Sequence, residues 1–317
     1  MTLLLACIAA CALFILLFLL GLAAFSGIIA GRVEKALPPK GKFIDIDGAH
    51  IHYLDEGSGP VIVMIHGLGG QSGHFAYALM SLLSSRFRVI AIDRPGSGHS
   101  TRPDSMPARL NAQGDVVAKL IQTLGVQRPL LVGHSLGGAV ALNVALRHPE
   151  SAGGLALIAP LTHLVEDVPA SFRALAIPSP AVRRFVAWTM AVPMSVFKGQ
   201  AVLDMVFSPE RPPKNFAIAA GGLLGLRPKS FHATSSDMMA VPDDLPAMMN
   251  AYASLALPFA MLYGKQDRVL DWQVQGQAMK AALPALQLEL VEGGHMLPIT
   301  MPEHVAAWIS RTAQKII

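Results

Sequence analysis

Charged residues are scarce in this 317-residue sequence. They make up 15% of the chain, while hydrophobic residues make up 52%; an average soluble protein has roughly 25% charged residues. No charged residue occurs from Thr2 to Gly31, and Leu3 to Leu20 is nearly continuous Leu, Ala, Ile and Phe. This composition excludes intrinsic disorder and collagen-like repeats, and the first segment meets the roughly 20-residue requirement of a membrane-spanning helix.

Cysteine is also scarce. Cys7 and Cys11 both lie in the apolar segment, one helical turn apart, so the rest of the chain can form no internal disulfide. A disulfide scaffold is therefore excluded. Basic residues outnumber acidic ones 25 to 21, for a formal net charge of +4, and they are scattered along the sequence. We therefore expect no nucleic-acid partner, because such proteins gather basic residues on one face.

The apolar segment is either a retained anchor or a cleaved signal peptide. A signal peptide has a basic start and an apolar stretch of roughly 7 to 15 residues, whereas this segment is longer and has no basic side chain before it. Small residues near Ala23 and Ser26 leave cleavage open. We expect residues 1–31 to be a single-pass transmembrane anchor and residues 32–42 a linker. The basic residues after the segment favour a cytoplasmic body, a tendency that a large translocated domain can override.

Strand-like and helix-like stretches alternate along the rest of the chain. Two short runs flank Asp47-Gly48 and predict an opening hairpin. Continuous apolar runs, typical of strands buried on both faces of a parallel sheet, occur at 60–65, 87–92, 130–132, 155–159 and 259–263. Helical spacing is found around residues 116–124 and 139–146, residues 286–290 alternate like an edge strand, and Pro302 opens a last helix. The pattern predicts an α/β fold with a doubly wound, mostly parallel sheet.

The interval 161–257 interrupts this alternation. It separates two core strands by far more residues than a simple crossover needs, and it contains seven of the 15 methionines and many prolines. We expect a helical cap inserted over one end of the sheet, so that the core consists of residues 43–160 and 258–317. An ordinary long helical connection is the alternative.

A nucleophile motif follows one of the buried runs. Gly133-His134-Ser135-Leu136-Gly137 places Gly-x-Ser-x-Gly directly after a strand and directly before a helix. A turn from strand to helix within one residue strains the backbone at the serine, and the two glycines allow the chain segments to approach. The hydroxyl is left at the helix N-terminus, where the helix dipole favours developing negative charge. Ser135 is therefore the candidate nucleophile.

A serine hydroxyl needs a base, and the base needs an orienting carboxylate. Asp267 lies just past the strand that ends near Tyr263, and His295 lies just past the following strand. Their order along the chain, Ser then Asp then His, is that of the nucleophile-elbow enzymes. Asp243 and Asp244 are the alternative acids, although they fall in the expected cap. His50 and His52, on one face of a strand, lack a third metal ligand nearby, so we expect no metal site.

These motifs together resemble those of the α/β-hydrolases. The resemblance covers 43–308 and rests on five segments in order: 66–70, 93–100, 133–138, 264–267 and 293–295. It implies Ser135 as nucleophile, His295 as general base and acid, and Asp267 as its partner. It also implies an oxyanion hole formed by the backbone N–H groups of Leu68 and Leu136. His66, Gly67, Gly133, His134 and Gly137 are the residues expected to shape the turns around these groups.

The α/β-hydrolase fold hosts several chemistries. Dehalogenases and epoxide hydrolases of this type use an aspartate at the elbow, where this chain has Ser135. We therefore expect hydrolysis of carboxylic esters through an acyl-enzyme. A small-molecule esterase, a haloperoxidase-like hydrolase, a proline-type peptidase and a catalytically silent binding module remain alternatives.

The expected anchor and cap suggest a substrate class. An anchor holds the body near a bilayer, and a Met-rich cap offers adaptable apolar walls that suit acyl chains. We expect a lipid-type ester, such as a monoacylglycerol or lysophospholipid, and the arrangement resembles membrane-anchored serine esterases and monoacylglycerol lipases. The expected partners are this substrate and the bilayer, with no metal or organic cofactor. Pairing of the anchors into a homodimer stays open.

Overall fold

An eight-stranded sheet forms the centre of the computed structural model, which describes residues 1–164 and 169–316. The strands are β1 (Lys42–Ile46), β2 (Ala49–Glu56), β3 (Val61–Ile65), β4 (Arg88–Ile92), β5 (Leu130–His134), β6 (Gly154–Ile158), β7 (Phe259–Gly264) and β8 (Gln287–Val291). Their spatial order is β1-β2-β4-β3-β5-β6-β7-β8, and the pairs from β4 to β8 are parallel. The predicted mostly parallel sheet is confirmed.

The first two strands form the predicted hairpin. β1 pairs antiparallel with β2, and β2 pairs antiparallel with β4. Asp47 and Gly48 between them have φ angles of 50° and 81°. Two consecutive positive φ angles belong to the type of two-residue turn whose twist matches that of the flanking strands, and Asp-Gly favours it.

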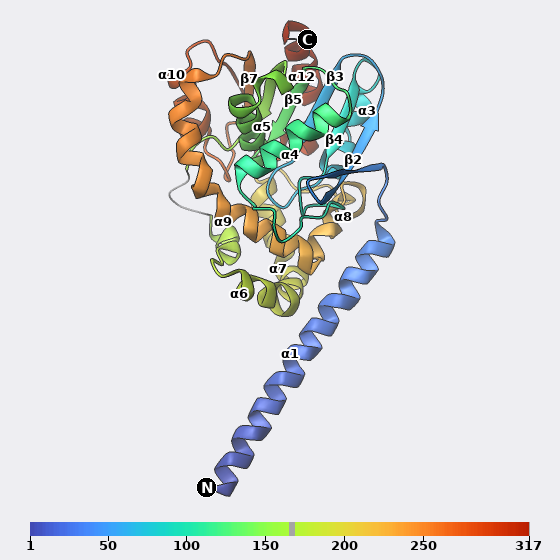
Figure 1. Ribbon diagram of the computed structural model, residues 1–317, viewed down its shortest axis with the longest axis vertical. Coiled ribbons are helices and arrows are strands. Elements are labelled where there is room, and N and C mark those ends of the chain that lie inside the picture. Colours follow the sequence, from blue (N-terminus) through green and yellow to red (C-terminus); the bar gives the residue numbers. More distant parts are fainter. Residues whose placement is uncertain (165–168, 317) are drawn as a thin grey trace.

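Helices cover both faces of the sheet (Figure 1). On one face, α4 (Leu110–Thr123) and α5 (Leu136–Arg147) pack on one core cluster; on the other, α3 (Leu79–Leu83) and α12 (Pro302–Ile316) pack on a second. Alternate residues of β3 enter the two clusters: Val63 and Ile65 the first, Ile62 and Met64 the second. This two-sided burial explains why the strands are continuous apolar runs. The shorter helices of the core are α2 (Gly73–Ala76), η6 (Gln273–Gln277), α10 (Ala278–Ala282) and α11 (Leu297–Thr300), and η1 (Pro149–Ser151) precedes β6.

The described part of the chain between β6 and β7 is helical. It contains η2 (Ala170–Leu175), α6 (Pro180–Val186), η3 (Ala187–Ala191), α7 (Val192–Phe207), α8 (Phe216–Ala219), η4 (Gly222–Leu226), α9 (Pro228–Ala251) and η5 (Tyr252–Ser254). We call these the cap helices. In Figure 1, α6, α7 and the beginning of α9 lie beyond one end of the sheet. The other end of α9 enters the core, where Leu245 and Met248 are buried.

The N-terminal helix α1 (Thr2–Ala36) projects away from the body (Figure 1). Its apolar N-terminal part is exposed, and only Ser26 and Val33 are buried along its length. Near its C-terminal end, Glu34 pairs with Lys229 of α9 at 2.9 Å. In the described residues, two helical stretches are long and apolar enough to cross a membrane by length and composition, Thr2–Ala36 and Pro180–Phe207.

Candidate active site

Ser135 stands at the sharp turn between β5 and α5. It is the residue before the first helical one, and its backbone has φ 54° and ψ −122°, a strained conformation for a non-glycine residue. A Cβ atom on Gly137 would lie 2.1 Å from the carbonyl oxygen of Ile65, and one on Gly133 would lie 2.6 Å from the carbonyl oxygen of Gly137. Only glycine therefore allows the helix to approach the sheet this closely, as the sequence predicts.

Asp267 and His295 are in direct contact. The Nδ1 of His295 lies 2.7 Å from Oδ2 of Asp267, and the carboxylate is fully buried. The other carboxylate oxygen, Oδ1, accepts hydrogen bonds from the backbone N–H groups of Val269 and Leu270 at 2.8 and 2.9 Å. These bonds fix the carboxylate, so it can hold the imidazole in one orientation with Nδ1 protonated.

The nucleophile turn and the histidine loop are joined by a hydrogen bond. His134, the residue before Ser135, donates from Nε2 to the carbonyl oxygen of His295 at 3.0 Å, and the two imidazole rings lie 5.0 Å apart. Burial, with a contribution from the nearby His295, holds the pKa of His134 well below its usual value. His134 is thus a neutral donor that brings the predicted base to the strand end carrying Ser135.

The alternative acids are engaged elsewhere. Asp244 accepts hydrogen bonds from Arg109 at 2.8 Å and from the backbone N–H of Asn111 at 3.0 Å. Asp243 lies 3.8 Å from the same arginine. Of the three candidates, Asp267 is the one beside His295.

The turn after β3 lies against Ser135. A Cβ atom on Gly67 would be 2.8 Å from the Cβ of Ser135 and 3.3 Å from its Oγ. The amide of the next residue, Leu68, therefore belongs to a turn that touches the candidate nucleophile. The amide of Leu136, at the N-terminus of α5, follows Ser135 directly. The two residues predicted to form the oxyanion hole thus lie in the turn that touches Ser135 and directly after Ser135.

His66 braces this turn. Its Nε2 accepts a hydrogen bond from the backbone N–H of Arg94 at 3.0 Å, and its Nδ1 donates to the carbonyl oxygen of Gly67 at 2.8 Å. Burial and the neighbouring Arg94 hold the pKa of His66 well below its usual value. Both ring nitrogens are occupied and the ring is neutral, which supports the expected role of His66 in shaping this turn.

An acidic residue of the cap helices supports the same turn. Arg94, fully buried, donates from Nε to the carbonyl oxygen of His66 and from Nη2 to that of Gly67, both at 3.0 Å. Its Nη1 contacts Asp237 of α9 at 2.7 Å, and Asp237 also pairs with Arg102. Sequence analysis did not identify Asp237, because no local pattern connects it to an arginine 143 residues earlier.

Glu210 is a second residue that sequence analysis missed. Its carboxylate oxygens accept hydrogen bonds from the backbone N–H of Gly294, next to His295, at 3.2 and 3.3 Å. A Cβ atom on Gly294 would lie 2.1 Å from the carbonyl oxygen of Ser208. The segment after α7 therefore packs directly on the histidine loop, and this contact explains the glycine before the histidine.

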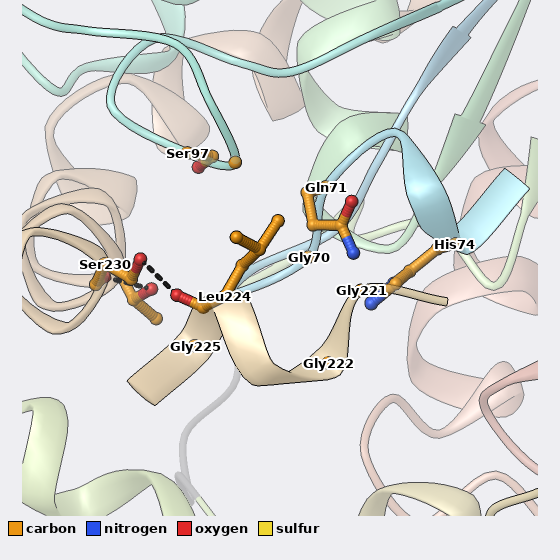
Figure 2. A pocket seen from close by; sticks show the side chains of 12 residues that line it. Gly70, Gln71, His74, Ser97, Gly221, Gly222, Leu224, Gly225 and Ser230 are labelled. Atoms are coloured by element: carbon orange, nitrogen blue, oxygen red, sulfur yellow. Dashed lines mark hydrogen bonds between the residues drawn. The ribbon is translucent and has the colours of Figure 1, made fainter. Parts of the chain in front are cut away.

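A small cavity of about 20 Å³ lies where the turn after β3 meets the cap helices. Figure 2 shows Gln71 and His74 facing the turn that contains Gly221 and Gly222. Gln71 donates to the carbonyl oxygen of Ala220. Burial lowers the pKa of His74 to about 4. The cavity has room for about one water molecule, so it joins the loop to the cap helices without offering space for an acyl chain.

Metal-ligating side chains do not gather in the described residues: no group of three or more His, Cys, Asp or Glu is placed to hold an ion. His52 uses both ring nitrogens, with Asp93 at 2.8 Å and the carbonyl oxygen of Lys40 at 2.6 Å. His50 contacts Asp45 at 2.6 Å.

Sequence comparisons agree with the fold. The family model described as "alpha/beta hydrolase fold" matches residues 60–302. An uncharacterized protein of Mycobacterium tuberculosis is 30% identical over 278 residues, covering 84% of this chain and 78% of that protein. The magnesium-chelatase 30 kDa subunit of Rhodobacter capsulatus is 30% identical over 249 residues, covering 75% of this chain and 81% of that protein.

Solved structures are similar over most of their length. A membrane phospholipase A, described as a novel bacterial virulence factor, has a TM-score of 0.69 at 23% identity, and the match covers 99% of this chain and 98% of the phospholipase chain. A thermophilic esterase from Thermogutta terrifontis has a TM-score of 0.65 at 23% identity, covering 87% of this chain and 99% of its own. At these identities the likeness establishes the fold, and the first match includes the N-terminal helix.

Proposed function

The chain belongs to the α/β-hydrolase family, and on that premise we propose that it is a serine hydrolase of carboxylic esters. The observation that carries this proposal is the buried pair of His295 and Asp267, 2.7 Å apart, in a loop bonded to the nucleophile turn. Ser135 is the nucleophile, His295 the general base and acid, and Asp267 the partner that orients the imidazole.

The proposed reaction has two steps. The Oγ of Ser135 attacks the ester carbonyl while Nε2 of His295 takes its proton, and the backbone N–H groups of Leu68 and Leu136 stabilise the oxyanion. Collapse of the tetrahedral intermediate releases the alcohol, which receives the proton from His295. A water molecule then attacks the acyl-enzyme by the same route and releases the acid. Asp267 stays ionised and keeps His295 in the productive tautomer.

We further propose a lipid-type ester, such as a monoacylglycerol or lysophospholipid, as substrate. Exposed apolar side chains gather on the cap helices α6, η3 and α7. They are Val182, Phe185, Trp188, Met190, Met194, Val196 and Phe197, between 45% and 81% exposed. α1 packs against η3 and α7 and then extends past them (Figure 1), so this apolar face and the apolar helix lie on the same side of the body. Such a face suits a bilayer surface, where lipid esters are found.

The contacts of α1 support its retention as a single-pass anchor, residues 1–31, rather than removal as a signal peptide. Ser26 and Val33 are buried against the body, and Glu34 is within 4 Å of both Lys229 and Arg227. Loss of the helix would uncover these surfaces. We therefore propose an anchor, a linker over residues 32–42 whose first part, to Ala36, continues the helix α1, a core in two parts and a cap whose walls hold the acyl chain.

Hydrolysis of an aryl ester series from acetyl to palmitoyl tests the proposal. The detergent-solubilised full chain is compared with Ser135→Ala as the blank. We expect higher kcat/KM for medium and long chains than for acetyl, and no hydrolysis above background in the variant. A sharp preference for acetyl or butyryl would make the protein a small-molecule esterase whose anchor sets location only, and equal rates in Ser135→Ala would refute the serine mechanism.

A further inference from the structure

A groove of about 870 Å³ lies outside the candidate active site. Its walls come from the loop after β4, residues 96–109, from α6 and η3, and from the first half of α9. Ser135, Asp267 and His295 are not among its lining residues. The groove therefore offers a place for a ligand that does not depend on the proposed ester hydrolysis.

Cationic side chains dominate the polar part of the groove. Its lining contains the five cations Arg102, Arg109, Arg183, Arg184 and Lys229, and the two carboxylates Asp104 and Asp243. Three of the cations have nearby partners of their own: Arg109 has Asp244 at 2.8 Å, Arg184 has Asp104 at 3.3 Å, and Lys229 has Glu34 at 2.9 Å. The remaining two are Arg102, which shares Asp237 with Arg94, and Arg183, which has no ion pair among the described residues.

Arg183 has no carboxylate partner among the described residues, although only 6% of its surface is exposed. Its Nη1 donates to Ser236 Oγ at 2.8 Å and its Nη2 to the carbonyl oxygen of Ile177 at 2.7 Å, and its buried Nε has no hydrogen-bond partner. Burial and the nearby positive charge of Arg102 lower the pKa of Arg183. A buried cation without a counter-ion is destabilising, so this guanidinium favours an anion beside it.

Arg102 shares its counter-ion with another arginine. Its partner Asp237 is fully buried and also pairs with the fully buried Arg94, so one carboxylate faces two guanidinium groups. The pKa of His232, which also lines the groove, is lowered by burial and then by Arg183 and Arg102. His232 is thus neutral at pH 7, and the positive charge on this wall comes from Arg183 and Arg102.

Apolar side chains also line the groove, and one of them, Trp188, adjoins α1. Trp188 lines the groove and is 48% exposed, and a Cβ atom on Gly27 of α1 would lie 4.0 Å from its ring. Met106 and Met239 add further apolar lining. An anion with an alkyl chain would therefore find cations and an apolar wall in one groove, next to the helix that we propose enters the bilayer.

We propose that this groove binds a phosphate or phosphate-ester anion, with Arg183 and Arg102 as its main cationic contacts. Guanidinium groups match phosphate oxygens with paired hydrogen bonds, and a phosphate would supply the negative charge that Arg183 lacks and that Arg102 shares with Arg94. The same chemistry is offered by a phospholipid headgroup and by free phosphate. The apolar lining at Trp188 favours the phospholipid over free phosphate, because only the phospholipid carries an alkyl chain that could lie there.

Binding is measured by calorimetry on full-length Ser135→Ala protein in an uncharged maltoside detergent. The probes are hexyl phosphate, inorganic phosphate and the neutral hexyl glucoside. A lipid headgroup site binds hexyl phosphate at least about tenfold more tightly than inorganic phosphate. Equal affinity for both phosphates identifies free phosphate as the ligand. Binding of hexyl glucoside as tight as that of hexyl phosphate, or no binding of either phosphate, overturns the proposal.

Variants in the same background locate the site. Arg183→Gln and Arg102→Gln are each expected to weaken phosphate binding at least about tenfold, since each removes a charge-assisted contact. Arg184→Gln is the matched control, because it removes one charge from the same helix and groove but from an exposed side chain that already has Asp104. Thermal unfolding without ligand identifies any variant that fails to fold. Equal weakening by Arg184→Gln would mean a general charge effect and would overturn the assignment.

This test is independent of ester hydrolysis. The probes carry no carboxylic ester and the Ser135→Ala background lacks the candidate nucleophile, so binding is measured even if the proposed activity is wrong. Conversely, absence of phosphate binding leaves the ester-hydrolysis measurements unaffected.

Discussion

The strand ends and the cap helices differ in how tightly the chain constrains them. At the strand ends, Ser135 and His295 are at most 8% exposed, and an added Cβ at Gly137 or Gly264 would lie 2.1 or 2.2 Å from a backbone oxygen. On the cap helices, Phe197 is 81% exposed, and Gly199 has no atom within 4 Å of an added Cβ. At the strand ends, even one added carbon atom would collide with the backbone. The cap helices have room for such an atom, and some of their apolar side chains are exposed.

The difference corresponds to two tasks. Catalytic groups need positions fixed within a fraction of an ångström, and the closely packed strand ends provide this. An exposed apolar face is an aggregation hazard unless something covers it. In our proposal the covering partner is the bilayer beside α1, so the two regions respond to different kinds of mutation.

The largest expected effect is on catalysis at the strand ends. Ser135→Ala and His295→Ala should each lower kcat for ester hydrolysis by about 10⁴-fold or more, because each removes a group that acts in every turnover. The double variant should lose no more than the worse single variant, since the residues act as a unit. Steady-state kinetics on a short-chain aryl ester measure this, and additive losses would contradict a joint role.

The next largest effect compares the two glycines directly. Gly137→Ala should destabilise the protein by more than about 4 kcal/mol, because its Cβ meets the carbonyl oxygen of Ile65 at 2.1 Å. Gly199→Ala in α7 should stabilise it by up to about 1 kcal/mol, since alanine favours a helix and nothing obstructs it. Urea unfolding in detergent followed by circular dichroism measures both. Similar changes in unfolding free energy at the two sites would contradict the difference in packing between the strand ends and the cap helices.

The free energy of unfolding is expected to fall at acidic pH because His134 is buried in its neutral form. The folded pKa of His134 is held well below its ordinary value of 6.5. Below about pH 6.5 the unfolded chain therefore binds a proton that the folded chain does not, and the free energy of unfolding falls as pH falls, by up to about 1.4 kcal/mol per pH unit for this histidine.

His134→Gln tests this effect, because glutamine keeps a donor for the carbonyl oxygen of His295 and cannot be protonated. Unfolding free energies at pH 7, 6 and 5 should fall less steeply in the variant than in the parent protein. An unchanged slope would show that His134 is not the group that titrates.

The smallest effect concerns the cap face. In nanodiscs with brominated acyl chains and with the partly exposed Trp272 replaced by phenylalanine, fluorescence from Trp188 should be quenched, because it is 48% exposed beside α1, whereas Trp308 is 3% exposed in the core. Replacing Trp188 with phenylalanine should abolish most of the quenching while leaving ester hydrolysis within about twofold. Quenching that persists in the variant would place the bilayer elsewhere.

Much of the fold was predictable from local sequence patterns. The buried strands are continuous apolar runs because both faces of the sheet are covered, and Asp47-Gly48 marks the hairpin because those residues accept positive φ angles. Ser135, Asp267 and His295 were predicted because each follows a strand, and parallel strands end at one edge of the sheet. The structure brings Asp267 and His295 into contact; their catalytic roles, the oxyanion hole and the division into core and cap stay predictions.

The sequence by itself determined the order of the motifs along the chain, the glycines around the candidate nucleophile and the apolar N-terminal helix. Each of these depends on neighbouring residues and their periodicity. Only the tertiary structure decided which distant side chains meet. Asp237 beside Arg94, Glu210 at the histidine loop and Arg183 without a carboxylate partner in the described residues belong to no motif in the sequence. Their meaning depends on long-range packing of the cap helices against the core, which no local periodicity encodes.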